Sequence, residues 1–516
     1  MIRLKSFLAI SLIVLLGNAT AVAQVSVNSE DAVINKVIDI AQNDNQTMSH
    51  LNILCNRFGG RLVGSDAYDN AADWCEYMFK KWGLEVIRQE VGELPVGFNR
   101  GPWFGRMIGG NNMTLHFTTP SYTSGTVGIQ RGHVVKEPKT RAQFERMKKT
   151  LKGAWVLITG QSSGWPIDYS EDGDAKRTKA IEEKRTDEPA TFYKEMVEAG
   201  ILGIIQSAKV PITTLYDRKN VEKMTFETLP TVPDIKLDEA QYKVIEDMVN
   251  RGEYFLLEFD IRNHFKMGPV KYHNIIGVLK GSEYPDEYVI CGGHLDAFDV
   301  ATGGVDCGTG VAPTMEAARM LALSGAKPKR TILFALWAAE EFGLLGSKHF
   351  VLSDTTKWPN ISNYFNRDGG PTVPMSVTVP PAMYEDFVKV CEPIGKVNPD
   401  FPFTVKKREG EPRPLPKSAG GSDHAYFQIN GIPTLSFNLG DPKGYNFNYR
   451  EIWHTDRDLY NKSIPEYMEH ASACNAIVLY GLANLDHLLS REGLFKKEEP
   501  APEKSAKDKK KKSSKK

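Results

Sequence analysis

Acidic and imidazole side chains that could bind a metal ion follow an apolar segment in the second half of this sequence. His294 and Asp296 come directly after Tyr288–Gly293, and residues two apart in an extended segment face the same side. Asp306 lies in a Gly-rich turn before a predicted helix, Val311–Leu323. An imidazole and carboxylates at strand ends, beside a helix N-terminus, are typical of a metal site. This stretch alone leaves a metal site and a plain surface pair equally open.

Further candidate ligands follow later apolar segments. Glu340 and Glu341 come after Thr331–Ala339, a run too apolar for an edge strand, so we expect the pair at the rim of a central strand. Adjacent residues point in different directions, so one glutamate can bind a metal ion while the other faces a bound water. Asp368 follows the next apolar segment, and His454 precedes the last predicted helix.

Together these residues form a candidate set for a two-metal centre. Five ligands with one shared carboxylate suit two zinc ions about 3.5–4 Å apart. Glu340 would then act as the base for a bridging water, and Asp296 would orient His294. His424 is a competing ligand that we place in the pocket wall, because the position of His454 fits better. The predicted ligands are His294, Asp306, Glu341, Asp368 and His454.

The segments that must position these side chains alternate between strand and helix from Lys271 onward. This alternation predicts an α/β fold with a mixed central sheet sandwiched by helices. We expect strands at Asn274–Leu279, Tyr288–Ile290, Thr331–Trp337, Ile361–Asn366 and Pro433–Phe437, and helices at Leu344–Leu352, Pro381–Ile394 and Pro465–Leu489. Earlier in the chain we expect helical structure at Asp31–Asn56, a helix capped by Ser65 and ending at Lys81, and a strand at Leu84–Glu90.

The pattern also divides the chain into domains. Residues 24–123 and 263–492 are predicted to form the catalytic domain in two parts, with an inserted domain at residues 124–262. The inserted domain contains no ligand cluster, and its charge-rich stretch Ser162–Glu188 is predicted to be a loop. Residues 493–516 are rich in Lys and lack apolar periodicity, which predicts a disordered basic tail.

The first 23 residues have the pattern of a secretory signal peptide. Arg3 and Lys5 precede a short apolar run, and Ala21-Val22-Ala23 fits a cleavage site. A membrane anchor is the alternative, but the apolar run is too short to span a bilayer comfortably. We therefore expect a secreted or periplasmic protein that is cleaved after Ala23.

Composition limits the other functional classes. The 516 residues allow two or three domains, and the formal net charge of zero gives no indication of nucleic-acid binding. The six cysteines are scattered and show no C-x-x-C pattern. A disulfide bond between Cys55 and Cys75 is one interpretation, although isolated buried thiols account for the cysteines better.

Several motifs together resemble peptidase family M28, the co-catalytic zinc exopeptidases, and most closely its carboxypeptidase Q branch. They are GGHLDAFD, GGVDCGTG, LWAAEEFGLLGS, NRDGG and WHTDRD. The central segment resembles the protease-associated domain that is inserted in many of these enzymes. The resemblance implies that His294 and Asp368 bind one zinc ion, that Glu341 and His454 bind the other, and that Asp306 bridges both. It also implies that Glu340 is the general base.

The sequence departs from the family pattern at two positions. Cys307 follows the bridging Asp306, where many members have Asp or Asn. Trp453 precedes the last histidine, where many members have a Tyr that donates to the oxyanion. Nearby tyrosines at 445, 449 and 460 could replace that donor.

The resemblance implies an exported di-zinc exopeptidase that hydrolyses dipeptides, or the N-terminal residue of short peptides, through a metal-bridging water. One alternative is a glutaminyl cyclase-like enzyme on the same fold, which uses one zinc and lacks the inserted domain. Another is a non-catalytic binding protein on the peptidase scaffold, which loss of ligands would mark. The expected partner is a short peptide, and neither nucleic-acid binding nor an integral membrane segment is expected. A homodimer is one alternative for the assembly. The inserted domain is predicted to be a lid or wall that limits substrate length.

Overall fold

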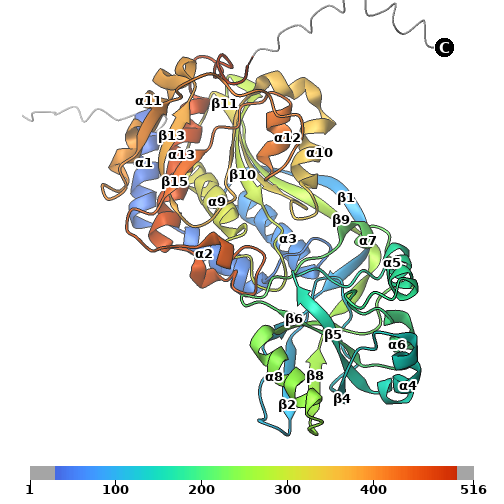
Figure 1. Ribbon diagram of the computed structural model, residues 1–516. Helices are drawn as coiled ribbons and strands as arrows, with labels where there is room; N and C mark the ends of the chain where they lie inside the picture. The colour runs from blue at the N-terminus through green and yellow to red at the C-terminus, as the bar shows by residue number, and fades with distance from the viewer. Residues whose placement is uncertain (1–29, 497–516) are drawn as a thin grey trace, which may run out of the picture.

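The computed structural model describes residues 30–496, which form two parts built on separate sheets (Figure 1). The body combines the chain before Asn99 with the chain after His264. The inserted module comprises residues 103–261 and contains its own sheet. The signal-peptide prediction, and nearly all of the predicted tail, lie outside the described residues.

The body is organised around a mixed five-stranded sheet, in the order β1-β9-β11-β10-β12. β1 and β11 both run antiparallel to β9, whereas β10 runs parallel to β11 and to β12. The predicted α/β fold with a mixed central sheet is therefore confirmed. The strands are β1 Glu85–Asn99, β9 His264–Leu279, β10 Tyr284–His294, β11 Arg330–Trp337 and β12 Ile361–Asn366.

Helices cover both faces of this sheet, and the central strand β11 supplies apolar side chains to each. Ile332 and Phe334 pack in the core under α3, α9 and α13, whereas Leu333 and Trp337 pack in a second core under α10 and α12. A strand that is buried on both faces reads as a continuous apolar run, as Ile332–Trp337 does. The helices are α3 Asp66–Lys81, α9 Gly308–Leu323, α10 Leu345–Ser353, α12 His424–Ile429 and α13 Pro465–Ala483.

Several helices differ from their predicted bounds. The helix predicted at Pro381–Ile394 consists of α11 Tyr384–Cys391 between two 3₁₀ turns, and α13 ends before the predicted Leu489. The helical prediction for residues 31–56 covers three helices, namely α1 Glu30–Asn43, α2 Thr47–Asn52 and the π-helix η1 Ile53–Phe58. Ser65 caps α3 as predicted, because its hydroxyl accepts a hydrogen bond from the Tyr68 N–H at 3.1 Å.

A small sheet in the order β14-β13-β15 lies beside β12 and corrects one predicted strand. The segment predicted as a strand at Pro433–Phe437 becomes a strand only at Phe437, where β15 begins. Asn363 explains the difference, since its side chain donates to Leu435 O at 3.0 Å and accepts from Leu435 N at 2.7 Å. One backbone bond joins the segment to β12, from Tyr364 N to Pro433 O at 2.9 Å, and the Asn363 side chain occupies the N–H and C=O of Leu435. The strands are β13 Val373–Val379, β14 Thr404–Lys407 and β15 Phe437–Gly440.

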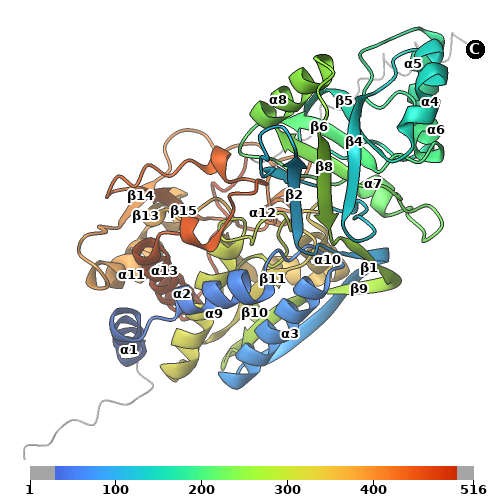
Figure 2. The ribbon, with the colours of Figure 1, turned by 90° about the horizontal axis from the view of Figure 1, so that it is seen from below.

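The inserted module contains a seven-stranded sheet, in the order β2-β8-β4-β5-β6-β7-β3. It begins at Trp103, earlier than the predicted start at residue 124. Figure 2 shows helices α4, α5, α6 and α8 around this sheet. The strands are β2 Trp103–Ile108, β3 Phe117–Thr118, β4 Gln130–Lys136, β5 Ala154–Ser162, β6 Gly203–Ala208, β7 Asp234–Asp238 and β8 Leu256–Ile261. The helices are α4 Arg141–Leu151, α5 Glu171–Glu182, α6 Tyr193–Glu198, α7 Arg218–Val221 and α8 Glu239–Asn250.

Two strands join the module to the body. Asn99 of β1 pairs with His264 of β9, and Trp103 of β2 pairs with Ile261 of β8. Arg262 N donates to Pro102 O at 3.1 Å between these two ladders. The chain therefore leaves the body and returns to it along one antiparallel ribbon.

The stretch Ser162–Glu188 was predicted to be a loop, which is wrong over the twelve residues of α5. Ser170 caps this helix by accepting from the Gly173 N–H at 3.2 Å, and acidic residues occupy the first turn. Both features stabilise a helix N-terminus. The loop prediction rested on the high charge density, although the sequence contains the residue that caps this helix.

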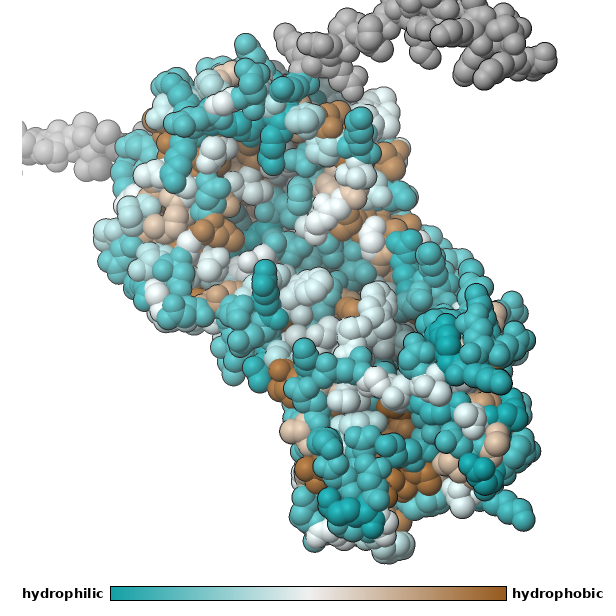
Figure 3. Space-filling model, viewed as in Figure 1, coloured by the Kyte–Doolittle hydropathy of each residue, from teal (hydrophilic) through white to brown (hydrophobic). Residues whose placement is uncertain are grey.

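Three further features concern the cysteines, the helices and the surface. All six cysteines are free and buried, so the Cys55–Cys75 bridge is absent. Across residues 30–496, no helix combines the length and apolarity that crossing a membrane requires. On the face seen in Figure 3 the surface is mostly hydrophilic, with hydrophobic residues in small scattered groups.

Candidate metal centre

His294 is the last residue of β10, and close backbone packing brings it to the start of α9. A Cβ atom on Gly293 would lie 2.8 Å from Arg367 O, and one on Gly310 would lie 2.2 Å from the same oxygen. Glycine at both positions therefore lets the end of β10, the first turn of α9 and the segment after β12 converge. The imidazole of His294 is buried at this meeting point.

Asp306 lies between the two predicted histidine ligands. Its Oδ1 is 3.1 Å from His294 Nε2, and its Oδ2 is 3.4 Å from His454 Nε2. The backbone N–H groups of Val305 and Asp306 donate to the buried Asp458 carboxylate at 2.6 and 3.2 Å. Asp458 thus fixes the turn that presents Asp306.

The other predicted ligands divide between the two histidines. Glu341 Oε2 lies 3.1 Å from His454 Nε2, and Asp368 Oδ1 lies 3.7 Å from His294 Nε2. Glu340 Oε2 lies 4.0 Å from His294 Nε2. The structure therefore brings the five predicted ligands and Glu340 together from the ends of β10, β11 and β12, the start of α9 and the loop before α13.

Asp296 contacts His294 through its backbone carbonyl rather than through its carboxylate. His294 Nδ1 bonds to the backbone carbonyl of Asp296 at 2.8 Å, while the Asp296 carboxylate is 3.8 Å away. That carboxylate instead accepts from the N–H groups of Glu340 and Glu341, both at 3.1 Å. A carbonyl only accepts, so Nδ1 carries a proton. Nε2 therefore is the ring nitrogen that faces Asp306 and would bind a metal ion.

The electrostatics of the site call for cations. Burial raises the pKa of Glu340 and that of Glu341 well above the usual range, and neighbouring carboxylates add to the effect. Burial would lower the pKa of His294, but the surrounding negative groups outweigh it and raise that pKa. Buried carboxylates at this density are costly unless they bind cations.

The cavity over these residues has a volume of about 230 Å³. Within the described part of the chain, neither Lys nor Arg lines it, and His294 Nε2 and Glu341 Oε1 are buried without a hydrogen-bond partner. Nitrogen and carboxylate donors in this arrangement fit zinc. The lining residues are Asp306, Glu340, Glu341, Asp368, Gly421, Tyr449, Trp453 and His454.

The departures from the family pattern can now be placed. Trp453 is half exposed and its ring stacks on His454 at 3.9 Å. Tyr445 is exposed and donates to Glu466 at 2.5 Å, whereas Tyr449 lines the cavity. Cys307 is buried beside the ligands, and its thiol donates to Arg367 O at 3.1 Å. Of the three nearby tyrosines, only Tyr449 lines the cavity.

Sequence reasoning overlooked some residues around the site. Asp423, beside the rejected ligand His424, is fully buried, and neither carboxylate oxygen has a hydrogen-bond partner among the described residues. Burial raises the pKa of Asp423 to about 7. Asp458 was also missed, although WHTDRD contains it. Adjacent motif carboxylates were the available signal, but the sequence does not say which ones are buried.

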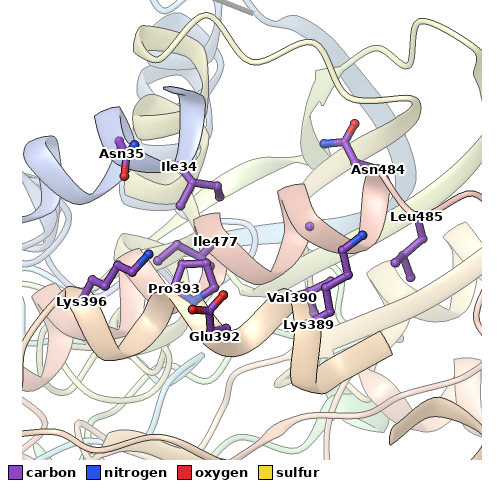
Figure 4. Close-up of a pocket in the computed structure, with 11 residues that line it drawn as sticks. Ile34, Asn35, Lys389, Val390, Glu392, Pro393, Lys396, Ile477, Asn484 and Leu485 are labelled. Carbon is purple, nitrogen blue, oxygen red and sulfur yellow. The ribbon is translucent and has the colours of Figure 1, made fainter. Parts of the chain in front are cut away.

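A larger cavity lies away from these residues. It has a volume of about 420 Å³ and lies between α1, α11 and α13 (Figure 4). Its charged side chains are Lys389, Glu392 and Lys396, and none of the predicted site residues lines it. Cavity size therefore does not identify the candidate centre, whereas the convergence of ligands does.

Comparison with known proteins supports the location of the candidate metal centre. Residues 274–479 match the model of peptidase family M28, and this range contains all the predicted ligands. Carboxypeptidase Q of Mus musculus is 23% identical over 487 residues, which cover 90% of this chain and 92% of that protein. Carboxypeptidase Q of Homo sapiens is 22% identical, with coverage of 89% and 90%.

Solved structures share the fold. A peptidase M28 precursor from Shewanella amazonensis aligns with a TM-score of 0.55 and 20% identity, covering 90% of this chain and 99% of that one. A zinc aminopeptidase from Bacillus subtilis aligns with a TM-score of 0.50 and 18% identity, covering 87% and 97%.

Proposed function

This chain is a metallopeptidase whose residues 274–479 match peptidase family M28, and on that premise we propose that it is an exported di-zinc exopeptidase. We propose that its substrates are dipeptides or the N-terminal residues of short peptides. Export rests on the sequence of residues 1–23.

The observation that carries the two-ion proposal is the placement of Asp306. One carboxylate oxygen is 3.1 Å from His294 Nε2 and the other is 3.4 Å from His454 Nε2. A carboxylate that presents one oxygen to each of two histidines suits a shared ligand. His294 and Asp368 would hold one zinc ion, and Glu341 and His454 would hold the other.

When bound, the zinc ions would supply Lewis-acid activation of a water molecule and of the peptide carbonyl. Glu340 lines the cavity, and its Oε2 lies 4.0 Å from His294 Nε2. Among the described residues, neither Lys nor Arg lines this cavity. It would take a proton from the attacking water and return it to the leaving amine. The Asp296 carboxylate accepts hydrogen bonds from the N–H groups of Glu340 and Glu341. These bonds fix the backbone position of both glutamates.

Tyr449 would donate to the oxyanion. It lines the same cavity, and burial raises the pKa of its hydroxyl, with the charge of Asp306 adding to the effect. The phenol therefore remains protonated and able to donate. Trp453 lines the cavity as well, but its ring is half exposed and stacks on His454, so we assign the role to Tyr449.

Metal content and peptide hydrolysis test this proposal. The purified chain should contain two zinc ions by mass spectrometry, lose dipeptide hydrolysis on chelation and regain it with zinc. His454→Ala should lose one ion, and Asp306→Ala should weaken both. His349→Ala is the matched control, because this α10 histidine lies outside the centre.

Two results would contradict it. One is a chain that holds fewer than two zinc ions after zinc supplementation. The other is a zinc-loaded chain that cyclises N-terminal glutamine but releases no amino acid from any dipeptide, which would favour the glutaminyl cyclase alternative.

A further inference from the structure

A short segment of the inserted module lies directly against the loops that carry two predicted ligands. This segment, Ile212–Arg218, connects β6 to α7 and lies where the module meets the body (Figures 1 and 2). Thr213 forms an antiparallel bridge with Thr455 of the body. The contact therefore falls next to His454.

Backbone hydrogen bonds connect this segment to the His454 loop. Thr214 N donates to His454 O at 3.1 Å, and Asp456 N donates to Ile212 O at 3.1 Å. Ile212 N donates to the Asp456 carboxylate at 3.1 Å. His454 has a φ of 56°, which non-glycine residues seldom adopt. The module thus supports a backbone conformation that the loop would not favour by itself.

The same segment holds the Glu341 loop. The Tyr216 hydroxyl donates to Glu341 O at 2.5 Å, and the Arg218 guanidinium donates to Phe342 O. The Tyr216 ring stacks on Phe342 with centroids 4.3 Å apart. Tyr216 is buried, so its hydroxyl bond is shielded from water.

An aromatic row links the two loops. The Tyr216 ring lies 5.5 Å from Phe298, and the Phe298 ring lies 4.3 Å from His454. Tyr216 therefore acts on Glu341 through its hydroxyl and on His454 through a neighbouring ring. These two ligands face each other at 3.1 Å and would hold the same zinc ion.

The other pair of ligands lacks such support. His294 ends β10, Asp368 follows β12, and both are positioned by the body. Over residues 30–496, no hydrogen bond or ion pair joins the inserted module to either side chain. Among the described residues, the module's hydrogen bonds to predicted ligands therefore reach only Glu341 and His454. Its Ser121 also donates to Asp299, in the loop after His294, at 2.6 Å. None of the module's residues lines the metal cavity.

We propose that the inserted module, through Tyr216, positions the ligands of one zinc site only, the site of Glu341 and His454. Tyr216 is a positioning residue, because it touches the backbone of Glu341 and the rings of Phe298 and Phe342 rather than the metal or the substrate. This inference rests on the proposed two-ion function. Loss of contacts that orient metal ligands typically weakens metal affinity by about 10–100-fold.

Tyr216→Phe tests this inference, because it removes the hydroxyl and keeps the stacked ring. The control is Tyr242→Phe, since Tyr242 lies within the module and donates to Ile158 O at 2.9 Å. Zinc affinity at each site is measured by competition with a chromophoric chelator. We expect one site of Tyr216→Phe to weaken by about 10–100-fold with the other unchanged, and both sites of Tyr242→Phe to match the wild type.

A second variant and the wild type distinguish the outcomes. Asp456→Ala removes the acceptor of Ile212 N and should weaken the same site while Tyr216 remains intact. If the wild type binds two ions and Tyr216→Phe and Asp456→Ala both bind them as tightly as Tyr242→Phe does, the positioning role is overturned alone. A wild type with fewer than two ions would overturn the proposed function and this inference together.

Discussion

Replacing Glu340 with glutamine separates the proposed base from the proposed ligand beside it. The two glutamates are adjacent, and both of their N–H groups donate to the Asp296 carboxylate. Their backbones are therefore held by the same residue. Their side chains differ, because Glu341 Oε2 is 3.1 Å from His454 Nε2 whereas Glu340 Oε2 is 4.0 Å from His294 Nε2. Glu340→Gln therefore leaves every close ligand pair intact.

The size of the effect follows from that difference. Loss of a general base costs about 10²–10⁴-fold in turnover, or about 3–5 kcal/mol of activation free energy. Glu340→Gln should lose this much in kcat and retain both zinc ions. Glu341→Gln removes a carboxylate oxygen that faces His454, so it should lose zinc first and activity as a consequence.

The assay combines zinc content with the kcat and KM of dipeptide hydrolysis for the wild type and both variants. Measuring Glu341→Gln at high zinc concentration separates lost metal from lost chemistry, since only lost metal is recovered. The reasoning is refuted if Glu340→Gln loses zinc while Glu341→Gln keeps it. It is also refuted if Glu340→Gln retains zinc and stays within tenfold of wild-type kcat.

Three further predictions concern other parts of the chain. Tyr449→Phe should lower kcat by about 10²–10³-fold with little change in KM, as for loss of an oxyanion donor, and an unchanged kcat would remove Tyr449 from that role. In a series of peptides with the same scissile bond, kcat/KM should fall steeply from dipeptides to longer chains, and a flat profile would indicate a general aminopeptidase. Burial lowers the pKa of His470 to about 4, and neither ring nitrogen has a partner among the described residues. Because the unfolded histidine binds a proton below about pH 6.5, folding stability should drop by about 2 kcal/mol at about pH 5. In urea unfolding of the chelated chain, the free energy of unfolding of His470→Leu should fall by about 2 kcal/mol less than that of the wild type between neutral pH and about pH 5. Equal losses in the two proteins would contradict the burial argument.

The sequence was most informative where an apolar strand ends in a charged residue. The apolar runs before Glu340 and Asp368 correspond to β11 and β12, and strand ends in open α/β sheets meet at one rim. The location of the candidate ligands could therefore be expected before any coordinates. Their grouping into two pairs came from the family resemblance, and the distances are compatible with it.

Other features depend on contacts that local patterns do not contain. Asn363 interrupts the strand predicted at Pro433–Phe437 through bonds between residues that are distant in sequence. The bonds from the Glu340 and Glu341 N–H groups to the Asp296 carboxylate could not be expected either, since backbone N–H groups carry no sequence signature. Tyr216 is one tyrosine among 19, and nothing near it in the sequence points to Glu341.

The ribbon between body and module gives the chain a natural site for deletion or grafting. Asn99 and His264 are paired neighbours, so a tight turn could join β1 to β9 directly and close the body's sheet without residues 100–263. Chain ends that are adjacent in space also make a folded insertion inexpensive in loop entropy, whatever its length. A body closed by such a turn would separate what the module contributes to the placement of Glu341 and His454 from what the body contributes by itself.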